Sequence, residues 1–433
     1  GLAAMMIVED DNSDTLMIPN TYGIDEIPMI IQDRAFDQNG VFLEFINPVL
    51  AGRPGDTVMI NGVLDAEHQT NAQMIRYRIL NASNTRTYYL GLSDNRDFYQ
   101  IGSDGGFLQS PVLINRLRLS PAERAEIVID FSGDQGQTID LMSYASELVQ
   151  FQPVFIVALQ DELDTLDYKI MSFAVGAPTT TPTPVYSLSN TLNFIPVYLE
   201  SNADVTRSFV LSNGPPMSIN GATMDMNVIN ETIQMGDMEV WTITNTSGSS
   251  HPFHIHGEPF QVISRSDGPV LESEQGWKDV VFVTMNQSGN PGWVKIIKPF
   301  NDFADTTYPY MYHCHILEHE DRGMMGQYLV VDTNSAQPVA AKELNSVPIE
   351  ISVYPNPLTE DAVNIRITSG SVELYDLTLI NHLGQHIRTL AKAGTLANGS
   401  SGFSIDLTGV PSGVYFIEIM NEGSLHHEKL IRL

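Results

Sequence analysis

Residues 238–257 read MEVWTITNTSGSSHPFHIHG, and this stretch shows the pattern that decides the fold. A run of β-branched and aromatic residues, Met238–Asn245, is followed by a break rich in Ser and Gly and then by a second short run. Runs of this kind, with Gly, Asn, Asp and Pro between them, are typical of β-strands joined by turns. The pattern recurs along the chain, for example at Gln73–Ala82, Ala125–Phe131, Val280–Met285 and Trp293–Lys298. Long segments of helical period are absent from the sequence, which therefore predicts an all-β protein built of several β-sandwiches.

Two stretches of unusual composition suggest where domains end. The length of 433 residues favours about three domains of roughly 150 residues each. A Pro/Thr-rich stretch at 177–185 cannot join a sheet and is expected to be a linker. A polar, Ala- and Asn-rich passage at 333–347 is the second predicted linker. The predicted domains are therefore 1–176, 186–332 and a smaller one at 348–433.

The histidines are concentrated in two places. Six of the eleven fall in two short windows, 251–257 (HPFHIHG) and 313–324 (HCHILEHEDRGM). On a strand, residues i and i+2 face the same side, so His254 can share a metal cluster with His256. His313 and His315 form a matching pair, and Cys314 between them then points to the opposite face.

The second window also carries sulfur ligands. The thiolate of Cys314 is flanked by imidazoles and is followed ten residues later by the thioether of Met324. Two His, one Cys and a weak axial Met are the soft ligand set of a blue-copper centre. The loop from Cys314 to Met324 is long enough to bring His319 to the same metal, and His251, on a different strand, would complete the trigonal plane.

Two other interpretations of these residues are open. A single buried histidine is usually a hydrogen-bonded core residue, and a free cysteine is usually a small buried hydrophobe. A zinc site would also use Cys and His, but it favours Cys-x-x-Cys or His-x-x-x-His spacing. Neither interpretation explains the two windows together, so the sequence favours copper.

The charge balance limits the partners. The chain has 22 basic and 52 acidic residues, a formal net charge of −30. Such an acidic surface repels nucleic acid and anionic lipid and favours neutral or cationic ligands. No apolar run reaches the roughly eighteen residues of a membrane span, so none is predicted. Cys314 is the single cysteine of the sequence, which excludes an intramolecular disulfide.

The two windows resemble the third and fourth copper motifs of multicopper oxidases, in particular bacterial laccases, cuprous oxidases and bilirubin oxidases. The resemblance extends over residues 1–332 and implies two cupredoxin-like Greek-key sandwiches. Residue by residue, it implies a type 1 copper held by His251, Cys314, His319 and Met324, a type 2 ligand in His254, and type 3 ligands in His256, His313 and His315. Glu320, directly after a type 1 ligand, matches an acid that delivers protons to oxygen in this family. The other interpretation of Glu320 is an exposed loop carboxylate.

The first part of the sequence departs from the family pattern. The family has four copper motifs, two of them in an N-terminal domain that this sequence does not contain. Half of the eight imidazoles that the family uses around its trinuclear cluster are therefore missing. Residues 1–10 resemble the segment that follows the second motif, so the chain is expected to be truncated there. His68, the one histidine upstream of the windows, is expected in a surface loop, and residues 276–279 (GWKD) resemble a strand entry near the type 1 site.

The last part of the chain carries motifs of a different kind, 353–357 (VYPNP), 381–385 (NHLGQ) and 407–417 (LTGVPSGVYFI). They predict turns between the strands of a small sandwich. The pattern resembles the type IX secretion C-terminal sorting domain of Bacteroidota, which has an Ig-like sandwich fold. The resemblance implies export by the secretion machinery, followed by surface attachment or release; an ordinary accessory β-domain is the alternative.

Together these features predict an oxidase that uses copper. The expected reaction takes electrons one at a time from phenolic, bilirubin-like or metal-ion substrates at the type 1 copper and reduces dioxygen to water at the trinuclear cluster. The expected partners are a small-molecule reductant, dioxygen and the absent N-terminal domain, so the chain as given is expected to be inactive. The alternative is a non-enzymatic blue-copper electron-transfer or copper-binding protein.

Overall fold

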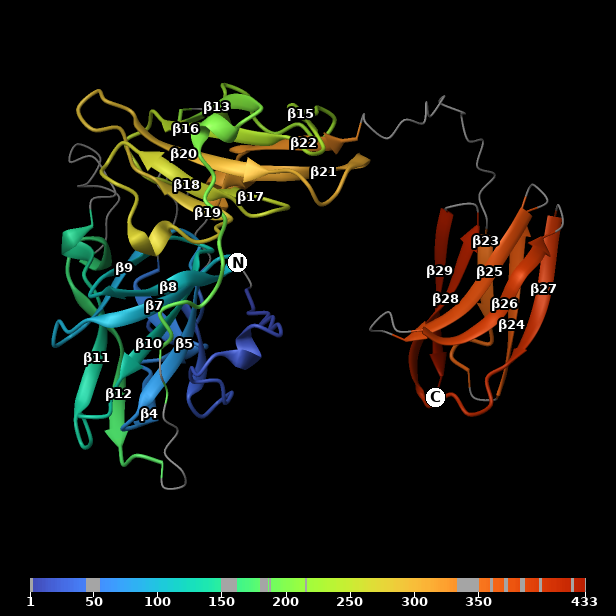
Figure 1. Ribbon diagram of the computed structural model, residues 1–433, viewed down its shortest axis with the longest axis horizontal. Coiled ribbons are helices and arrows are strands. Elements are labelled where there is room, and N and C mark those ends of the chain that lie inside the picture. Colours follow the sequence, from blue (N-terminus) through green and yellow to red (C-terminus); the bar gives the residue numbers. More distant parts are fainter. Residues whose placement is uncertain are drawn as a thin grey trace. The chain divides into compact units, whose positions relative to one another are not determined.

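The computed structural model describes residues 3–43, 55–148, 162–179, 186, 188–214 and 216–332, and then 350–358, 361–369, 373–381, 386–396, 399–421 and 424–432. The chain divides into two compact units, Gly1–Ser335 and Ala336–Leu433 (Figure 1). Strands dominate the described residues of both units, so the all-β prediction is confirmed. Of the predicted linkers, residues 180–185 and 333–347 lie outside the described residues.

The first unit begins with a β-sandwich of two facing sheets (Figure 1). One sheet has the strand order β3 (Val63–Leu64), β2 (Thr57–Ile60), β1 (Glu26–Arg34), β5 (Met74–Asn81), β10 (Arg124–Asp130), β7 (Phe98–Ser103) and β8 (Gly106–Ile114). The other has the order β4 (Glu67–Asn71), β12 (Tyr168–Gly176), β11 (Thr138–Ser143), β6 (Tyr88–Leu92) and β9 (Leu117–Leu119). Because β1 pairs with β5 and β4 with β12 in parallel, both sheets are mixed.

Strand β5 illustrates how the sequence closes this sandwich. Ile75 and Tyr77 point into the core between the sheets and are fully buried. Arg76 and Arg78 alternate with them and are also buried, on the opposite side of the strand. Both guanidinium groups form ion pairs with Glu126 of the neighbouring β10, so the buried charges are compensated.

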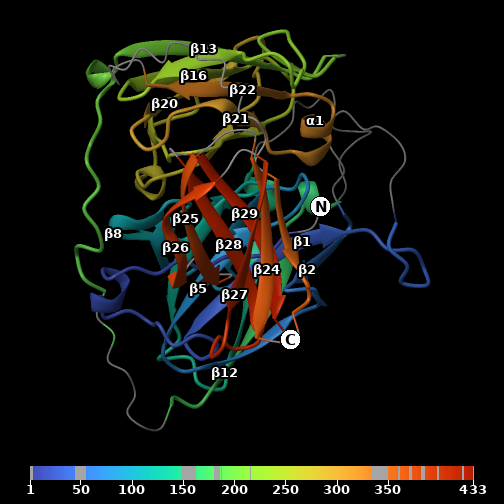
Figure 2. The ribbon, with the colours of Figure 1, turned by 90° about the vertical axis from the view of Figure 1, so that its right-hand side faces the viewer.

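A second sandwich follows in the same unit and carries both histidine windows. One sheet has the order β14 (Ser218–Ile219), β13 (Val205–Ser212), β16 (Met238–Asn245), β20 (Gly292–Pro299) and β18 (Gln261–Arg265). The facing sheet has the order β15 (Glu231–Gln234), β22 (Met325–Val331), β21 (Asp305–Cys314), β17 (His251–Ile255) and β19 (Val280–Val283). A short helix, α1 (Leu317–Asp321), follows β21 after two residues and is labelled in Figure 2.

Aromatic side chains fill the core of the second sandwich. Trp241 of β16 is fully buried and packs against the rings of Phe209, Tyr312 and Tyr328. Its indole N–H donates to the buried carboxylate of Glu239 at 2.7 Å, so the polar end of the ring is satisfied. This rigid core lies directly behind the strands that carry the histidines.

Two glycines allow the sandwiches of the first unit to approach each other closely. The Gly105 N–H donates to the Trp277 carbonyl at 2.8 Å, and a Cβ at Gly105 would lie 2.5 Å from the Trp277 Cβ. A Cβ at Gly276 would collide with the Ser103 hydroxyl in the same way. Glycine is therefore required at Gly105 because its backbone lies against that of Trp277, and at Gly276 because the Ser103 and Leu108 side chains occupy the space of a Cβ.

The second unit is a small sandwich that folds around its own core. Its sheets have the orders β23 (Glu350–Tyr354), β24 (Ala362–Ser369), β27 (Gly399–Asp406) and β26 (His386–Leu396), β25 (Glu373–Asn381), β28 (Gly413–Asn421), β29 (Ser424–Arg432). Buried residues from both sheets, such as Ile365 and Leu379, meet in this core. Residues 382–385 of the predicted turn motif lie outside the described residues.

In the part of the chain that the structure describes, the remaining helices are single turns of 3-10 type, at Ser13–Thr15, Ala145–Glu147, Glu162–Asp164, Glu200–Asn202 and Glu272–Glu274. Among the described residues, no helix is long and apolar enough to cross a membrane.

Candidate metal centres

Strand alternation separates the predicted ligands into two groups. On β17, Phe253 and Ile255 point into the core, and so does Cys314, which is paired with Phe253 on the neighbouring β21. His254 and His313 are paired one position along the same two strands and therefore face the other side of the sheet. We call His251, Cys314 and His319 the thiolate group, and His254, His256 and His313 the imidazole group.

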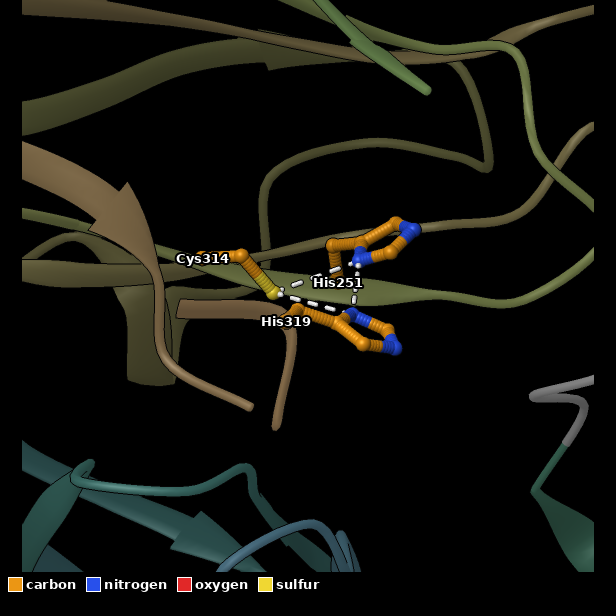
Figure 3. Close-up of side chains that lie close together, drawn as sticks. All are labelled: His251, Cys314 and His319. Carbon is orange, nitrogen blue, oxygen red and sulfur yellow. Dashed lines mark hydrogen bonds between the residues drawn. The ribbon is translucent and has the colours of Figure 1, made fainter. Parts of the chain in front are cut away.

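The three side chains of the thiolate group lie close together (Figure 3), and all three are buried. The Cys314 Sγ lies 3.2 Å from His251 Nδ1 and 3.5 Å from His319 Nδ1, and the two imidazole nitrogens are 3.2 Å apart. All three residues are 0% exposed. The strand β17, the end of β21 and the helix α1 each supply one of them.

These three atoms fit a copper ion. Ligand atoms about 2.0–2.3 Å from one metal stand roughly 3.3–3.8 Å apart in trigonal or tetrahedral geometry, close to the observed distances. Two imidazoles and a thiolate without a carboxylate are a soft donor set, which suits copper and excludes hard ions such as calcium or magnesium.

The protonation states also fit metal binding. Burial, with the neighbouring His319, holds the pKa of His251 well below its usual range, so the imidazole is neutral and has a free lone pair. Burial raises the pKa of the Cys314 thiol, so a metal must displace its proton. The Ile316 backbone N–H points at the same sulfur, 3.5 Å away, and would stabilise the thiolate.

A polar chain behind His251 orients its ring. The Ser247 hydroxyl lies 2.7 Å from His251 Nε2 and 2.6 Å from the Asn245 side-chain oxygen. The Ser247 hydroxyl can donate to the Asn245 oxygen and accept the N–H of His251 Nε2. The Nδ1 of His251 is then free for a metal. Asn245 is itself fixed, because its amide donates to the Ser249 carbonyl at 2.8 Å.

Replacing Ser247 with alanine is therefore expected to weaken copper binding at the thiolate group by about ten-fold, the usual effect of losing an outer-shell partner of a ligating histidine. Competition with a chelator of known affinity measures it. Ser208→Ala is a suitable control, because Ser208 is an exposed residue of β13. An unchanged affinity in Ser247→Ala would mean that the core packing alone holds the His251 ring.

Met324, the predicted axial ligand, is close to the thiolate group through its backbone. Its carbonyl accepts the Cys314 N–H at 3.1 Å, and its N–H donates to the His319 carbonyl at 2.9 Å. The residue is 0% exposed and belongs to the same core as Cys314. Met324 as a copper ligand stays a prediction.

The imidazole group lies where β17 and β21 end. The ring centroid of His254 lies 5.0 Å from that of His256 and 5.3 Å from that of His313, and the centroids of His256 and His313 are 5.5 Å apart. The His315 ring centroid is 5.3 Å from that of His313 and 5.6 Å from that of His254, so the four imidazoles lie together, although only those of the imidazole group have ligand nitrogens within 4.8 Å of one another. His256 is exposed, whereas His313 is buried.

Hydrogen bonds leave the outer nitrogens of this group available. His254 Nδ1 lies 2.8 Å from the Asp279 carbonyl, and His313 Nδ1 lies 3.0 Å from the Cys314 carbonyl, so Nε2 of each ring can face a metal. Burial and the neighbouring His313 lower the pKa of His254 to about 3, and burial likewise lowers the pKa of His313. Neutral, oriented imidazoles are what metal binding requires.

Glu320 lies in contact with the imidazole group. One carboxylate oxygen is 3.4 Å from His313 Nδ1, and the side chain is about one quarter exposed, with a relative exposure of 27%. Burial, followed by the nearby Asp321, raises the pKa of Glu320. The alternative of an exposed loop carboxylate therefore does not describe this residue, although its role in proton delivery stays a prediction.

Several features of the site were not predicted from the sequence. Ser247 and the Asp279 carbonyl hold the ligand rings, but neither belongs to a recognisable metal motif. The expectation for His68 was wrong: it lies on β4, is half-buried and is 3.1 Å from the Tyr77 hydroxyl. The segment 276–279 does lead into a strand, β19, and its last residue contacts His254 of the imidazole group.

Two protein-family models match parts of the chain. The family model described as multicopper oxidase matches residues 195–334, which include both histidine windows. The family model described as secretion system C-terminal sorting domain matches residues 352–432.

Individual relatives extend the match over the first unit. The cell division protein FtsP of Dickeya dadantii is 32% identical over 340 residues, covering 77% of this chain and 67% of the relative, and that of Escherichia coli is 33% identical over 330 residues, covering 76% and 66%. The chain thus spans about two thirds of the length of these relatives.

Solved structures give a similar result. The McoA multicopper oxidase of Aquifex aeolicus has a TM-score of 0.65 and 31% identity, over 75% of this chain and 70% of that one. The laccase-like multicopper oxidase CueO of Ochrobactrum has a TM-score of 0.63 and 30% identity over the same shares.

Proposed function

The chain belongs to the multicopper oxidase family, and from this we propose that it is the copper-binding part of an oxidase that passes electrons from a small reductant to dioxygen. One observation carries the proposal: the buried convergence of His251, Cys314 and His319 within 3.5 Å of one another. Two imidazoles and a thiolate in an enclosed site are suited to copper that changes oxidation state without losing its ligands.

The protein supplies a direct covalent connection between the two groups. Copper, when bound, would contribute one-electron oxidation and reduction. Cys314 belongs to the thiolate group, while its direct neighbours His313 and His315 stand at the imidazole group. One peptide bond links Cys314 to each of these histidines. The backbone therefore connects the site where an electron would enter to the site where oxygen would react.

The chain's own residues also exclude water and handle protons. The thiolate group has no exposed member, which keeps water from the sulfur. We assign proton delivery to Glu320, because its carboxylate reaches His313 Nδ1 at 3.4 Å. The substrate class follows from the family resemblance: phenolic, bilirubin-like or metal-ion reductants, which the acidic chain favours when they are neutral or cationic.

The proposal is tested by oxygen consumption with hydroquinone as reductant. The copper-loaded protein isolated from its native host, in whatever length it is made there, is expected to consume oxygen steadily. The 433 residues alone are expected to accept one electron per chain without steady consumption, since the four imidazoles at the second site are half the number that the family resemblance implies. A native protein that is loaded with copper but consumes no oxygen would contradict the proposal.

A second candidate is a non-enzymatic role, as a blue-copper electron carrier or copper-binding protein. The observation in its favour is that the curated relatives carry the name cell division protein. The same assay separates the two candidates, because such a carrier would accept an electron and then consume no oxygen in any form of the protein.

The match to a sorting domain implies export by a secretion system. We propose that the exported protein is attached to the cell surface or released. Deleting residues 350–433 is expected to leave copper binding unchanged, because all the predicted ligands lie in the first unit, and to retain the protein inside the host cell. Immunoblots of medium, surface and cell fractions measure this. Unchanged export of the deleted form would contradict the role of the second unit.

A further inference from the structure

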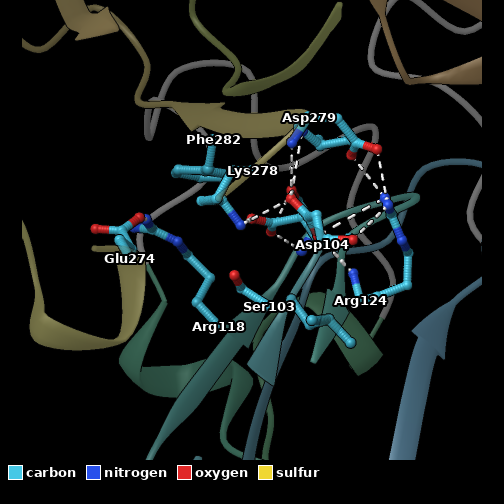
Figure 4. A network of polar contacts seen from close by, with 12 residues as sticks. Ser103, Asp104, Arg118, Arg124, Glu274, Lys278, Asp279 and Phe282 are labelled. Carbon is cyan, nitrogen blue, oxygen red and sulfur yellow. Dashed lines mark hydrogen bonds and ion pairs between the residues drawn. The ribbon is translucent and has the colours of Figure 1, made fainter. Parts of the chain in front are cut away.

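The two sandwiches of the first unit are joined by a network of charged residues around Asp104 (Figure 4). The Asp104 side chain is 0% exposed, and the residue lies between β7 and β8 of the first sandwich. One of its oxygens accepts the Arg124 backbone N–H at 2.8 Å. The other lies 3.0 Å from the Lys278 ammonium and 3.3 Å from both the Asp279 and Val280 backbone N–H groups.

Arg124 makes a second link between the sandwiches. Its guanidinium forms a two-pronged ion pair with Asp279, at 2.6 and 2.7 Å, and also donates to the Asp104 carbonyl at 2.9 Å. Lys278 is fixed from the same side, because its ammonium lies 2.9 Å from the Glu123 carboxylate. Residues 278–280 are thus held by the first sandwich through both side chains and backbone.

The held segment is the one that orients a predicted metal ligand. The Asp279 carbonyl accepts from His254 Nδ1 at 2.8 Å and from the Ile255 backbone N–H at 3.1 Å. Val280 is the residue directly opposite His254 in the ladder between β17 and β19. Any shift of the segment therefore moves the acceptor that determines which way the His254 ring faces.

We propose that Asp104, Arg124 and Asp279 are positioning residues through which the first sandwich, which contributes no predicted copper ligand, sets the orientation of His254 in the imidazole group. The inference rests on the proposed function, since it assigns a metal to that group. A bidentate arginine–carboxylate pair fixes direction as well as distance, which simple packing between two domains does not require. Residues that orient a ligating histidine through hydrogen bonds usually affect the metal affinity of the site.

The chain offers a matched control for this network. Arg118 of β9 also crosses between the sandwiches, pairing with Glu274 at 2.6 Å and lying 4.5 Å over the Phe282 ring. Its contacts do not involve the Asp279 carbonyl. If the ion pairs served only to hold the sandwiches together, Arg124→Gln and Arg118→Gln would have the same consequences.

The experiment titrates the full chain with Cu²⁺ and follows it by electron paramagnetic resonance, which distinguishes copper bound to a thiolate from copper bound to imidazoles alone. Arg124→Gln is expected to lower the affinity of the imidazole-bound copper by about ten-fold and to leave the thiolate-bound copper unchanged. Asp279→Asn, which keeps the carbonyl and the shape of the side chain, is expected to act in the same direction. Arg118→Gln is expected to change neither affinity, and Arg124→Lys is expected to recover part of the loss.

Two results would overturn the inference. Equal effects of Arg124→Gln and Arg118→Gln on the imidazole-bound copper would show that the network only joins the domains. A wild-type chain that binds copper at the thiolate group and none at the imidazoles would contradict the proposed function of the second site, and the inference with it. Thermal melting shows whether each variant folds. If Arg124→Gln does not fold, the affinity of Asp279→Asn for imidazole-bound copper tests the inference instead.

Discussion

Replacing Cys314 with serine is expected to abolish the blue colour of the copper-loaded protein. It is also expected to weaken copper binding at the thiolate group by at least about 100-fold, because losing an outer-shell partner of a ligand already costs up to that much. The Cys314 sulfur is the one soft anionic donor of that group, and it sits within 3.5 Å of both imidazole nitrogens. A hydroxyl cannot replace it, because serine stays protonated and is a hard donor.

A reciprocal variant provides the control. His256→Ala removes an exposed member of the imidazole group and should leave the blue colour intact while lowering the copper bound elsewhere. Visible spectra and copper stoichiometry of both variants measure the effects together. Blue colour that survives in Cys314→Ser would show that the thiolate is not the copper ligand.

Replacing Lys298 with methionine is expected to stabilise the protein by about 3–5 kcal/mol at pH 6, since each pKa unit corresponds to about 1.36 kcal/mol. Lys298 is 0% exposed, and among the described residues its amine has no hydrogen-bond partner; the amine lies 5.1 Å from the centroid of the Phe300 ring. Burial lowers its pKa from 10.5 to about 7. Methionine fills a similar volume without a charge to desolvate.

The pH dependence has a definite sign. The folded-state pKa of Lys298 is below that of the unfolded chain, so between about pH 7 and 10.5 the unfolded state binds more protons and stability rises with pH. Below pH 7 Lys298 is protonated in both the folded and the unfolded state, so the full cost of burying its charge lowers the stability. Above pH 10.5 the amine is neutral in both states and this cost vanishes. The gain from Lys298→Met should therefore be largest below pH 7 and should disappear near pH 10.5.

Denaturant unfolding at pH 6, 8 and 10 measures this gain. Lys295→Met is the matched control, because Lys295 lies on the same strand but is 30% exposed and pairs with Glu200 at the surface. Its replacement is expected to change stability by less than about 0.5 kcal/mol. A loss of stability in Lys298→Met at pH 6 would mean that the buried amine has a stabilising partner.

The features that the sequence predicted well are local ones. The two histidine windows begin on β17 and at the end of β21, and a period of two residues is enough to send Cys314 to one face of the sheet and His313 to the other. Runs of β-branched and aromatic residues between turn residues likewise predicted the strands, such as β5 and β16, because residues close together in the chain carry this signal.

The features that the sequence did not predict depend on distant segments. Asp104 and Asp279 are 175 residues apart, and nothing in either neighbourhood shows that the first carboxylate will accept the N–H of the second. Ser247 is four residues before His251, yet only the turn between β16 and β17 brings its hydroxyl to the ring. His68 was assigned to the surface because its neighbours are polar, although the Tyr77 ring on another sheet partly covers it.

The central claim is that the thiolate group binds copper, and titration of the 433 residues with one equivalent of Cu²⁺ tests it most directly. Visible and electron paramagnetic resonance spectra are recorded after the addition. The account predicts an intense blue thiolate-to-copper absorption and the small copper hyperfine splitting of a type 1 site, both saturating near one copper per chain. A colourless protein whose copper shows the large splitting of ordinary nitrogen and oxygen ligands would contradict the account.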